Sequence, residues 1–188
     1  MVLTDLSSIA RLEIQSILAY IIWIGRDVKR EVKLLSNASE KLPFLDRAAY
    51  PAKGKAVFQA KCQSCYDQQG QVLLTEDKNS HVNPSLWGKE SFNDITGISR
   101  FTNMAGYVKN NKPYGAAYLN PQLTNEEAWD VAAFINSQPR PHKGQLRDWP
   151  NLKRKPLDLS FGPCADSDIQ KQHKFGPFKP IRDAQKKS

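Results

Sequence analysis

The sequence predicts an all-α fold, and three observations support this prediction. Apolar residues between Leu6 and Val28 recur at helical spacing. The segment that starts at Thr124 has the Thr-x-x-Glu pattern of a helix capping box, followed by apolar residues on one face. No segment shows the apolar/polar alternation of a strand. With 188 residues, 40% of them hydrophobic, the chain can form one compact domain with extensions.

The N-terminal segment predicts one amphipathic helix over about residues 5 to 33, with Thr4 or Asp5 available to cap its start. Its apolar run, Ile17 to Ile24, is far shorter than the roughly 20 residues that span a bilayer. The start of the chain is not basic and no small-residue cleavage site follows, so no signal peptide is visible. We expect the apolar stripe of this helix to pack on the main domain or on a partner.

The middle of the chain predicts short helices joined by long loops. Residues 51 to 65 start with Pro51 in a position suited to a first helical turn, and they place Cys62 and Cys65 at the end of the helix. Residues 66 to 90 read as a long loop. We predict two helical segments over about 91 to 97 and 99 to 111, and a last strong helix that starts at Thr124 and is stopped by Pro139 and Pro141.

These elements divide the chain into a helix with its linker at 1–42, a central domain at 43–140, and an irregular C-terminal extension at 141–188. The charge is uneven. Residues 1 to 139 carry 15 basic and 14 acidic side chains, whereas residues 140 to 188 carry 12 and 5. A basic extension favours acidic partners, anionic lipid or nucleic acid, but it does not choose among them.

The pair Cys62 and Cys65 is followed by Tyr66, and this CxxC motif has several interpretations. A thiol redox centre normally lies at a helix N-terminus, whereas this pair lies at a C-terminus, which opposes thiolate formation. A zinc site would need four ligands, and no second tight pair is present. The remaining cysteine, Cys164, reads as a semi-buried free thiol. The other residues weighed as zinc ligands are His81, His142 and His173.

The order of the elements resembles a class I cytochrome c domain: a helix ending in CxxC, a wrapping loop, small middle helices and a terminal amphipathic helix. Gly54 and Phe58, with Val131 and Phe134, match the helix crossing of that fold. Roughly residues 45 to 181 also resemble the C-terminal haem domain and tail of thiosulfate dehydrogenase-type dihaem cytochromes. The matching runs are LWGKESFNDITGISRF, VKNNKPYG, LTNEEAWDVAAFINSQPRP and QHKFGPFKPI.

The resemblance implies a haem c site in which Cys62 and Cys65 form the thioether links. The position of the family's proximal histidine is occupied by Tyr66, and the position of its distal methionine, before Pro113, is occupied by Lys112. Tyrosinate and neutral lysine amine can both bind iron, so Tyr66 and Lys112 are the candidate iron ligands. Substitute ligands would be Met104, on an apolar helix face, and His81, in the wrapping loop.

The function that the resemblance implies is electron transfer through haem c to an acidic redox partner, in the periplasm, without nucleic acid. The alternative is a haem-free module that keeps the scaffold for binding. The N-terminal helix resembles the closing helix of a preceding haem domain, so we expect the family's first haem site to be absent. The chain then resembles an electron carrier or a non-catalytic module more than a complete thiosulfate dehydrogenase. The oligomeric state stays open.

Overall fold

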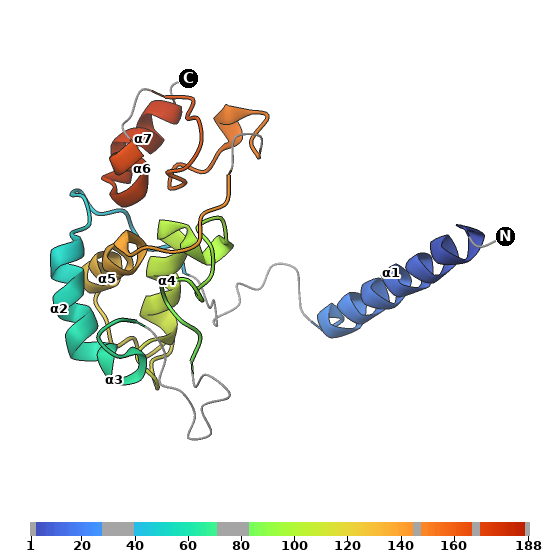
Figure 1. Ribbon diagram of the computed structural model, residues 1–188, viewed down its shortest axis with the longest axis horizontal. Helices are drawn as coiled ribbons and strands as arrows, with labels where there is room; N and C mark the ends of the chain where they lie inside the picture. Colours follow the sequence, from blue (N-terminus) through green and yellow to red (C-terminus); the bar gives the residue numbers. More distant parts are fainter. Residues whose placement is uncertain (1–2, 28–39, 71–82, 145–147, 167–169, 187–188) are drawn as a thin grey trace. The chain divides into compact units, whose positions relative to one another are not determined.

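The computed structural model describes residues 3–27, 40–70, 83–144, 148–166 and 170–186 (Figure 1). The fold over these ranges is all-α, as predicted, with short helices joined by long loops and without a β-strand. The α-helices are α1 (Leu3–Gly25), α2 (Pro51–Lys61), α3 (Gln63–Tyr66), α4 (Phe101–Asn111), α5 (Asn125–Ser137), α6 (Gln170–Phe175) and α7 (Phe178–Gln185). Two 3₁₀ turns, η1 (Gly97–Ser99) and η2 (Leu152–Arg154), complete the set.

The chain forms two compact units, Met1–Leu35 and Ser36–Ser188. The first contains α1, which confirms the predicted N-terminal helix. The helix ends at Gly25 rather than at 33, because glycine favours helix termination; residues 28 to 33 lie outside the described ranges. Within those ranges, no helix combines the length and apolarity that a membrane span requires.

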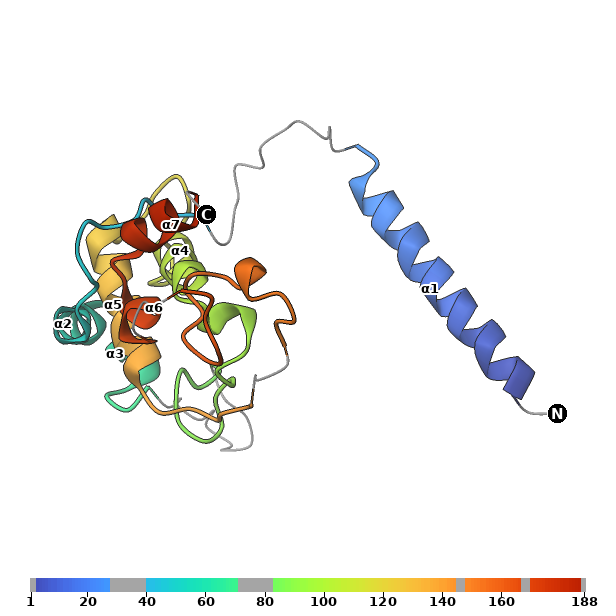
Figure 2. The ribbon, with the colours of Figure 1, turned by 90° about the horizontal axis from the view of Figure 1, so that it is seen from above.

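The second unit is built around the crossing of α2 and α5, which lie against each other in Figures 1 and 2. The backbones approach so closely that a Cβ on Gly54 would overlap the carbonyl oxygen of Asp130. Beside this contact the Phe58 ring packs 5.4 Å from the ring of Phe134, centre to centre. Only glycine fits the contact point, and the aromatic rings fill the space around it. The crossing predicted from Gly54, Phe58 and Phe134 is therefore present.

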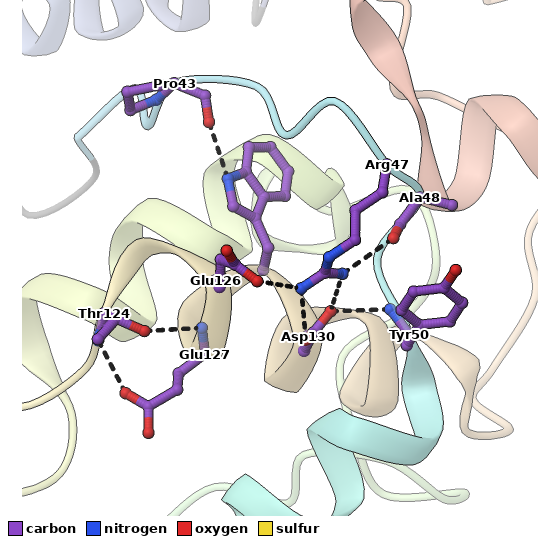
Figure 3. Close-up of polar contacts among 9 residues, drawn as sticks. Pro43, Arg47, Ala48, Tyr50, Thr124, Glu126, Glu127 and Asp130 are labelled. Atoms are coloured by element: carbon purple, nitrogen blue, oxygen red, sulfur yellow. Dashed lines mark hydrogen bonds and ion pairs between the residues drawn. The ribbon is translucent and has the colours of Figure 1, made fainter.

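Polar contacts fix the start of α5 and its link to the chain before α2 (Figure 3). The side chain of Thr124 accepts a hydrogen bond from the backbone N–H of Glu127, and the Glu127 carboxylate accepts one from the backbone N–H of Thr124. This is the predicted capping box. On the same helix the buried Asp130 carboxylate binds both terminal nitrogens of Arg47, at 2.8 and 3.0 Å, and accepts the N–H of Tyr50. The hydrogen bonds with Asp130 raise the pKa of Arg47.

The C-terminal extension contributes directly to the core. From α7, Phe178 packs against Phe101 of α4 and Trp129 of α5, with ring centres 5.6 and 5.9 Å apart. Ile181 on the same helix is 1% exposed. Because these side chains are buried among residues of α4 and α5, the extension and the central helices share one hydrophobic core.

A buried carboxylate also joins the extension to the start of α4. Asp158 has a fully buried side chain and accepts hydrogen bonds from the Arg100 guanidinium, from the Thr102 hydroxyl and from the Thr102 backbone N–H. The backbone N–H lies in the first turn of α4, where helix donors have no partner within the helix. Asp158 therefore gives the Thr102 N–H of α4 a hydrogen-bond acceptor, as a helix-capping side chain would.

The predicted helix over 91 to 97 is wrong. The segment forms turns up to η1, because its polar side chains bond the local backbone. The Asn93 side chain accepts the N–H of Ile95, and the hydroxyls of Ser91 and Thr96 donate to backbone carbonyls three residues earlier. Such contacts compete with helical hydrogen bonds. The neighbouring prediction, a helix over 99 to 111, is confirmed by α4.

Candidate functional site

An apolar cavity of about 600 Å³ lies in the second unit, and all four predicted site residues line it. One wall comes from α2 and α3, a second from α4 and the turn after it, and a third from the loop that follows Asn83. This volume falls in the range of ordinary small-molecule and cofactor sites. The lining residues are Lys61, Cys62, Cys65, Tyr66, Asn83, Pro84, Ser85, Leu86, Phe92, Ile98, Met104, Tyr107, Val108, Lys112, Pro113, Tyr114 and Ile135.

The junction of α2 and α3 positions the two cysteines. Cys62 lies between the helices with a φ of −124°, outside the helical region, and its backbone N–H still bonds the carbonyl of Phe58. The turn buries Cys62 and leaves Cys65 exposed, with both thiols free. Burial, and then the neighbouring Cys65, raise the pKa of the Cys62 thiol to about 11. The raised pKa opposes thiolate formation at Cys62, and its main cause is burial rather than the helix C-terminus on which the sequence prediction was based.

The cavity brings Tyr66 and Lys112 into contact. Tyr66 ends α3 and is buried. Lys112 caps the end of α4 in an extended conformation, which the following Pro113 favours. The Lys112 ammonium lies 5.4 Å from the centre of the Tyr66 ring. Burial by itself would lower the pKa of Lys112, but the interactions with Tyr66, and then with Tyr107 and Cys65, outweigh it and leave the pKa above its ordinary value.

The other residues weighed from the sequence fall in different places. Met104 is buried on α4 and lines the cavity, while His81 lies outside the described residues. Those zinc candidates that the structure describes do not lie near the CxxC pair. His142 bonds Asp94, whereas Cys164 lies with Asp166 and His173 beside α6. Cys164 is a half-buried free thiol, as predicted.

Sequence reasoning missed part of the cavity wall. Tyr107 lines the cavity three residues after Met104, and its charge interaction contributes to the raised pKa of Lys112. The spacing of Met104, Tyr107 and Val108 on one face of α4 was the signal that could have identified it. Phe92 and Ile98 also line the cavity, but the irregular segment that carries them offered no such pattern.

This arrangement of helices, cysteine pair and apolar cavity is that of a cytochrome c domain. Residues 51–139 match the cytochrome c family model, which supports a c-type cytochrome domain in this part of the chain. Members of that family carry electrons on a covalently attached haem.

The curated proteins that the chain resembles include thiosulfate dehydrogenases. The chain is 36% identical to the thiosulfate dehydrogenase of Allochromatium vinosum over 66% of this chain and 44% of that protein. It is 32% identical to the thiosulfate dehydrogenase of Thiomonas intermedia over 65% of this chain and 38% of that protein. The chain thus spans less than half the length of these relatives.

A solved structure of the thiosulfate dehydrogenase from Marichromatium purpuratum is 28% identical to the chain. The match covers 62% of this chain and 23% of that one, with a TM-score of 0.49.

The residues present fit a haem in part. The cavity has mainly apolar walls, as a porphyrin requires, and both thiols border it. Tyr66 offers a phenol oxygen to the same space. The fit of Lys112 as a ligand is poorer, because its raised pKa keeps the amine protonated near neutral pH and a protonated amine has no lone pair for iron.

Proposed function

We propose that the second unit is an electron-transfer module that holds haem c in the apolar cavity, with thioether links at Cys62 and Cys65. The observation that supports this most directly is the meeting of both cysteines and Tyr66 on one apolar cavity. Haem supplies reversible one-electron chemistry at its iron. The protein contributes binding, orientation and the exclusion of water.

Tyr66 is the iron ligand in this proposal, and Lys112 is its charged neighbour. Tyrosine phenolate is an established haem ligand and favours the ferric state. Lys112 could bind iron only after losing its proton, which the contact with Tyr66 opposes. Of the two ligand candidates, the contacts therefore favour Tyr66.

The basic extension supports the choice of partner. With 12 basic and 5 acidic side chains over residues 140 to 188, it would attract an acidic redox protein and speed the encounter. For this unit we propose one-electron transfer without substrate chemistry. By family resemblance this would take place in the periplasm.

Production of the protein together with cytochrome c maturation machinery tests the proposal. We expect a Soret band and a haem stain that survives denaturing electrophoresis. The double variant Cys62→Ser, Cys65→Ser should lose the stain, whereas Cys164→Ser should keep it, because Cys164 does not line the cavity. A wild-type protein with neither the band nor the stain would contradict the proposal.

A second candidate is a haem-free domain that binds an apolar ligand, and the contact between Lys112 and Tyr66 favours it. That contact gives each side chain a polar partner without iron. Thiol labelling of the purified, unfolded protein separates the two candidates. A thioether-linked haem would leave Cys164 as the reactive thiol, whereas a haem-free chain would label at Cys62 and Cys65 as well.

A further inference from the structure

A second pocket, of about 280 Å³ and more polar than the first, lies where the end of α5 meets the extension. It shares no lining residue with the apolar cavity, so the two pockets are separate. The lining residues are Asp94, Ser99, Phe101, Asn136, Gln138, Arg140, His142, Asp158, Ser160, Phe161 and Lys174.

Arg140 is one of two cations in this pocket, and its guanidinium is incompletely paired. One terminal nitrogen donates to the carbonyl of Ile135, at 2.6 Å, and the guanidinium stacks 4.4 Å from the centre of the Phe92 ring. The other terminal nitrogen, Nη1, is buried and has no hydrogen-bond partner among the described residues. A buried guanidinium with an unpaired nitrogen indicates a missing acceptor.

Lys174 is the second cation, and it comes from α6. It is partly buried, and its ammonium lies 5.3 Å from the centre of the Phe175 ring without an ion pair among the described residues. Burial, and then the charge of Arg140, lower the pKa of Lys174; burial lowers that of Arg140 to about 10. Two cations thus share a partly dehydrated site in which each disfavours the other.

The two acidic residues in the pocket are already engaged elsewhere. Asp94 bonds the His142 ring and the backbone N–H of Lys143. Asp158 is held by Arg100 and Thr102. Neither forms an ion pair with Arg140 or Lys174 among the described residues, although Asp94 is near enough to offset part of the charge. The two basic side chains of the pocket are therefore not paired with its two acidic side chains.

One unpaired acceptor also lines the pocket. The Asn136 amide nitrogen donates to the carbonyl of Ser99, while its buried oxygen, Oδ1, has no partner among the described residues. A ligand that satisfies both this oxygen and the cations needs negative charge and one proton to donate.

We propose that this pocket binds a small oxyanion that retains a proton, such as hydrogen phosphate, between Arg140 and Lys174, with Asn136 accepting the proton. The anion relieves the repulsion between the two cations and gives the buried guanidinium an acceptor. Charge-assisted hydrogen bonds of this kind are among the strongest that proteins form.

Calorimetric titration of the full chain with inorganic phosphate, at constant ionic strength in chloride, tests the proposal. We expect one phosphate per chain and weaker binding of sulfate, which has no proton to donate near neutral pH. The variant Lys174→Met should bind phosphate at least about tenfold more weakly. Its fold is not at risk, because the substitution keeps the stem and removes a charge that burial disfavours. Thermal unfolding without phosphate checks this.

The matched control is Lys171→Met, on the same helix but exposed and outside the pocket. It should bind phosphate within about twofold of the wild-type protein, since exposed charges contribute little. Equal losses in both variants, or no phosphate binding by the wild-type chain, would overturn the site. Equal affinity for sulfate and phosphate would overturn the role given to Asn136.

Discussion

The Lys112 ammonium lies 5.4 Å from the centre of the Tyr66 ring, so the two residues predicted to face iron also face each other. One ends α3 and the other caps α4, far apart in the sequence. Their contact raises the pKa of Lys112, which opposes the loss of the proton that iron binding by the amine would require.

The first prediction concerns this contact. In Tyr66→Phe the polar interaction with the phenol group is lost while burial remains, so the pKa of Lys112 should fall below that of the wild-type protein. Side-chain NMR titration of the haem-free protein measures it. The control is Tyr114→Phe, because Tyr114 borders the same cavity but is 98% exposed. An unchanged Lys112 pKa in Tyr66→Phe would show that the contact does not set the titration.

The second prediction restores the usual ligands. The double variant Tyr66→His, Lys112→Met, made with maturation machinery, should carry a reducible low-spin haem. Imidazole nitrogen and thioether sulfur form the His/Met ligand pair that raises the reduction potential. Visible spectra of the oxidised and reduced protein measure the spin state. A variant that folds but binds no haem would show that the cavity itself no longer accepts the cofactor.

The third prediction concerns the crossing of α2 and α5. Gly54→Ala places a Cβ against the backbone of Asp130, which cannot move aside as a side chain can. We expect a loss of about 2 kcal/mol or more in the free energy of unfolding, although helix propensity alone favours alanine by about 1 kcal/mol. Urea denaturation measures it.

The control for that substitution is Gly97→Ala. A Cβ at Gly97 meets nothing within 4 Å, so the free energy of unfolding should change by no more than about 0.5 kcal/mol. Similar losses at Gly54 and Gly97 would mean that glycine flexibility, rather than close helix contact, explains the effect.

The fourth prediction concerns pH. The hydrogen bond from the Thr124 backbone N–H, followed by the contact with Lys61, lowers the pKa of Glu127 below its ordinary value of 4.5. A lowered carboxyl pKa stabilises the fold above the ordinary value, and the contribution disappears as pH falls through the lowered pKa. The stability difference between wild-type protein and Glu127→Gln should therefore shrink on acidification below about pH 4.5.

Denaturant unfolding at several pH values measures this difference. Glu90→Gln, at an exposed position without a hydrogen bond or ion pair among the described residues, should show no such dependence. A difference between wild-type protein and Glu127→Gln that stays constant from neutral to acid pH would contradict the assignment.

The sequence predicted those elements in which the local sequence signals and the tertiary packing favour the same structure. The capping box at Thr124 and the glycine at position 54 both act through short-range rules, so the start of α5 and its contact with α2 could be predicted. The segment around Asn93 was mispredicted because side-chain contacts to the backbone overrode its helical pattern.

The candidate site, too, could be predicted from the sequence only in part. That Cys62, Cys65, Tyr66 and Lys112 share a cavity was implied by the resemblance and agrees with the structure. The contact between Tyr66 and Lys112 depends on how the end of α4 meets α3, which no local pattern specifies. The proximity of Arg140 and Lys174 could not be predicted from the sequence either, since it arises where the C-terminal extension packs against the end of α5.

The hydrogen bonds that Asp158 accepts from the start of α4 affect the design of fragments and chimeras of this protein. The segment that carries the family pattern, residues 51–139, omits Asp158, Phe178 and Ile181. Excised alone, it would start α4 with an unbonded Thr102 and expose the core around Phe101. A chimera that transplants this domain should therefore continue through α7, because the hydrophobic core includes residues beyond the segment that matches the family model.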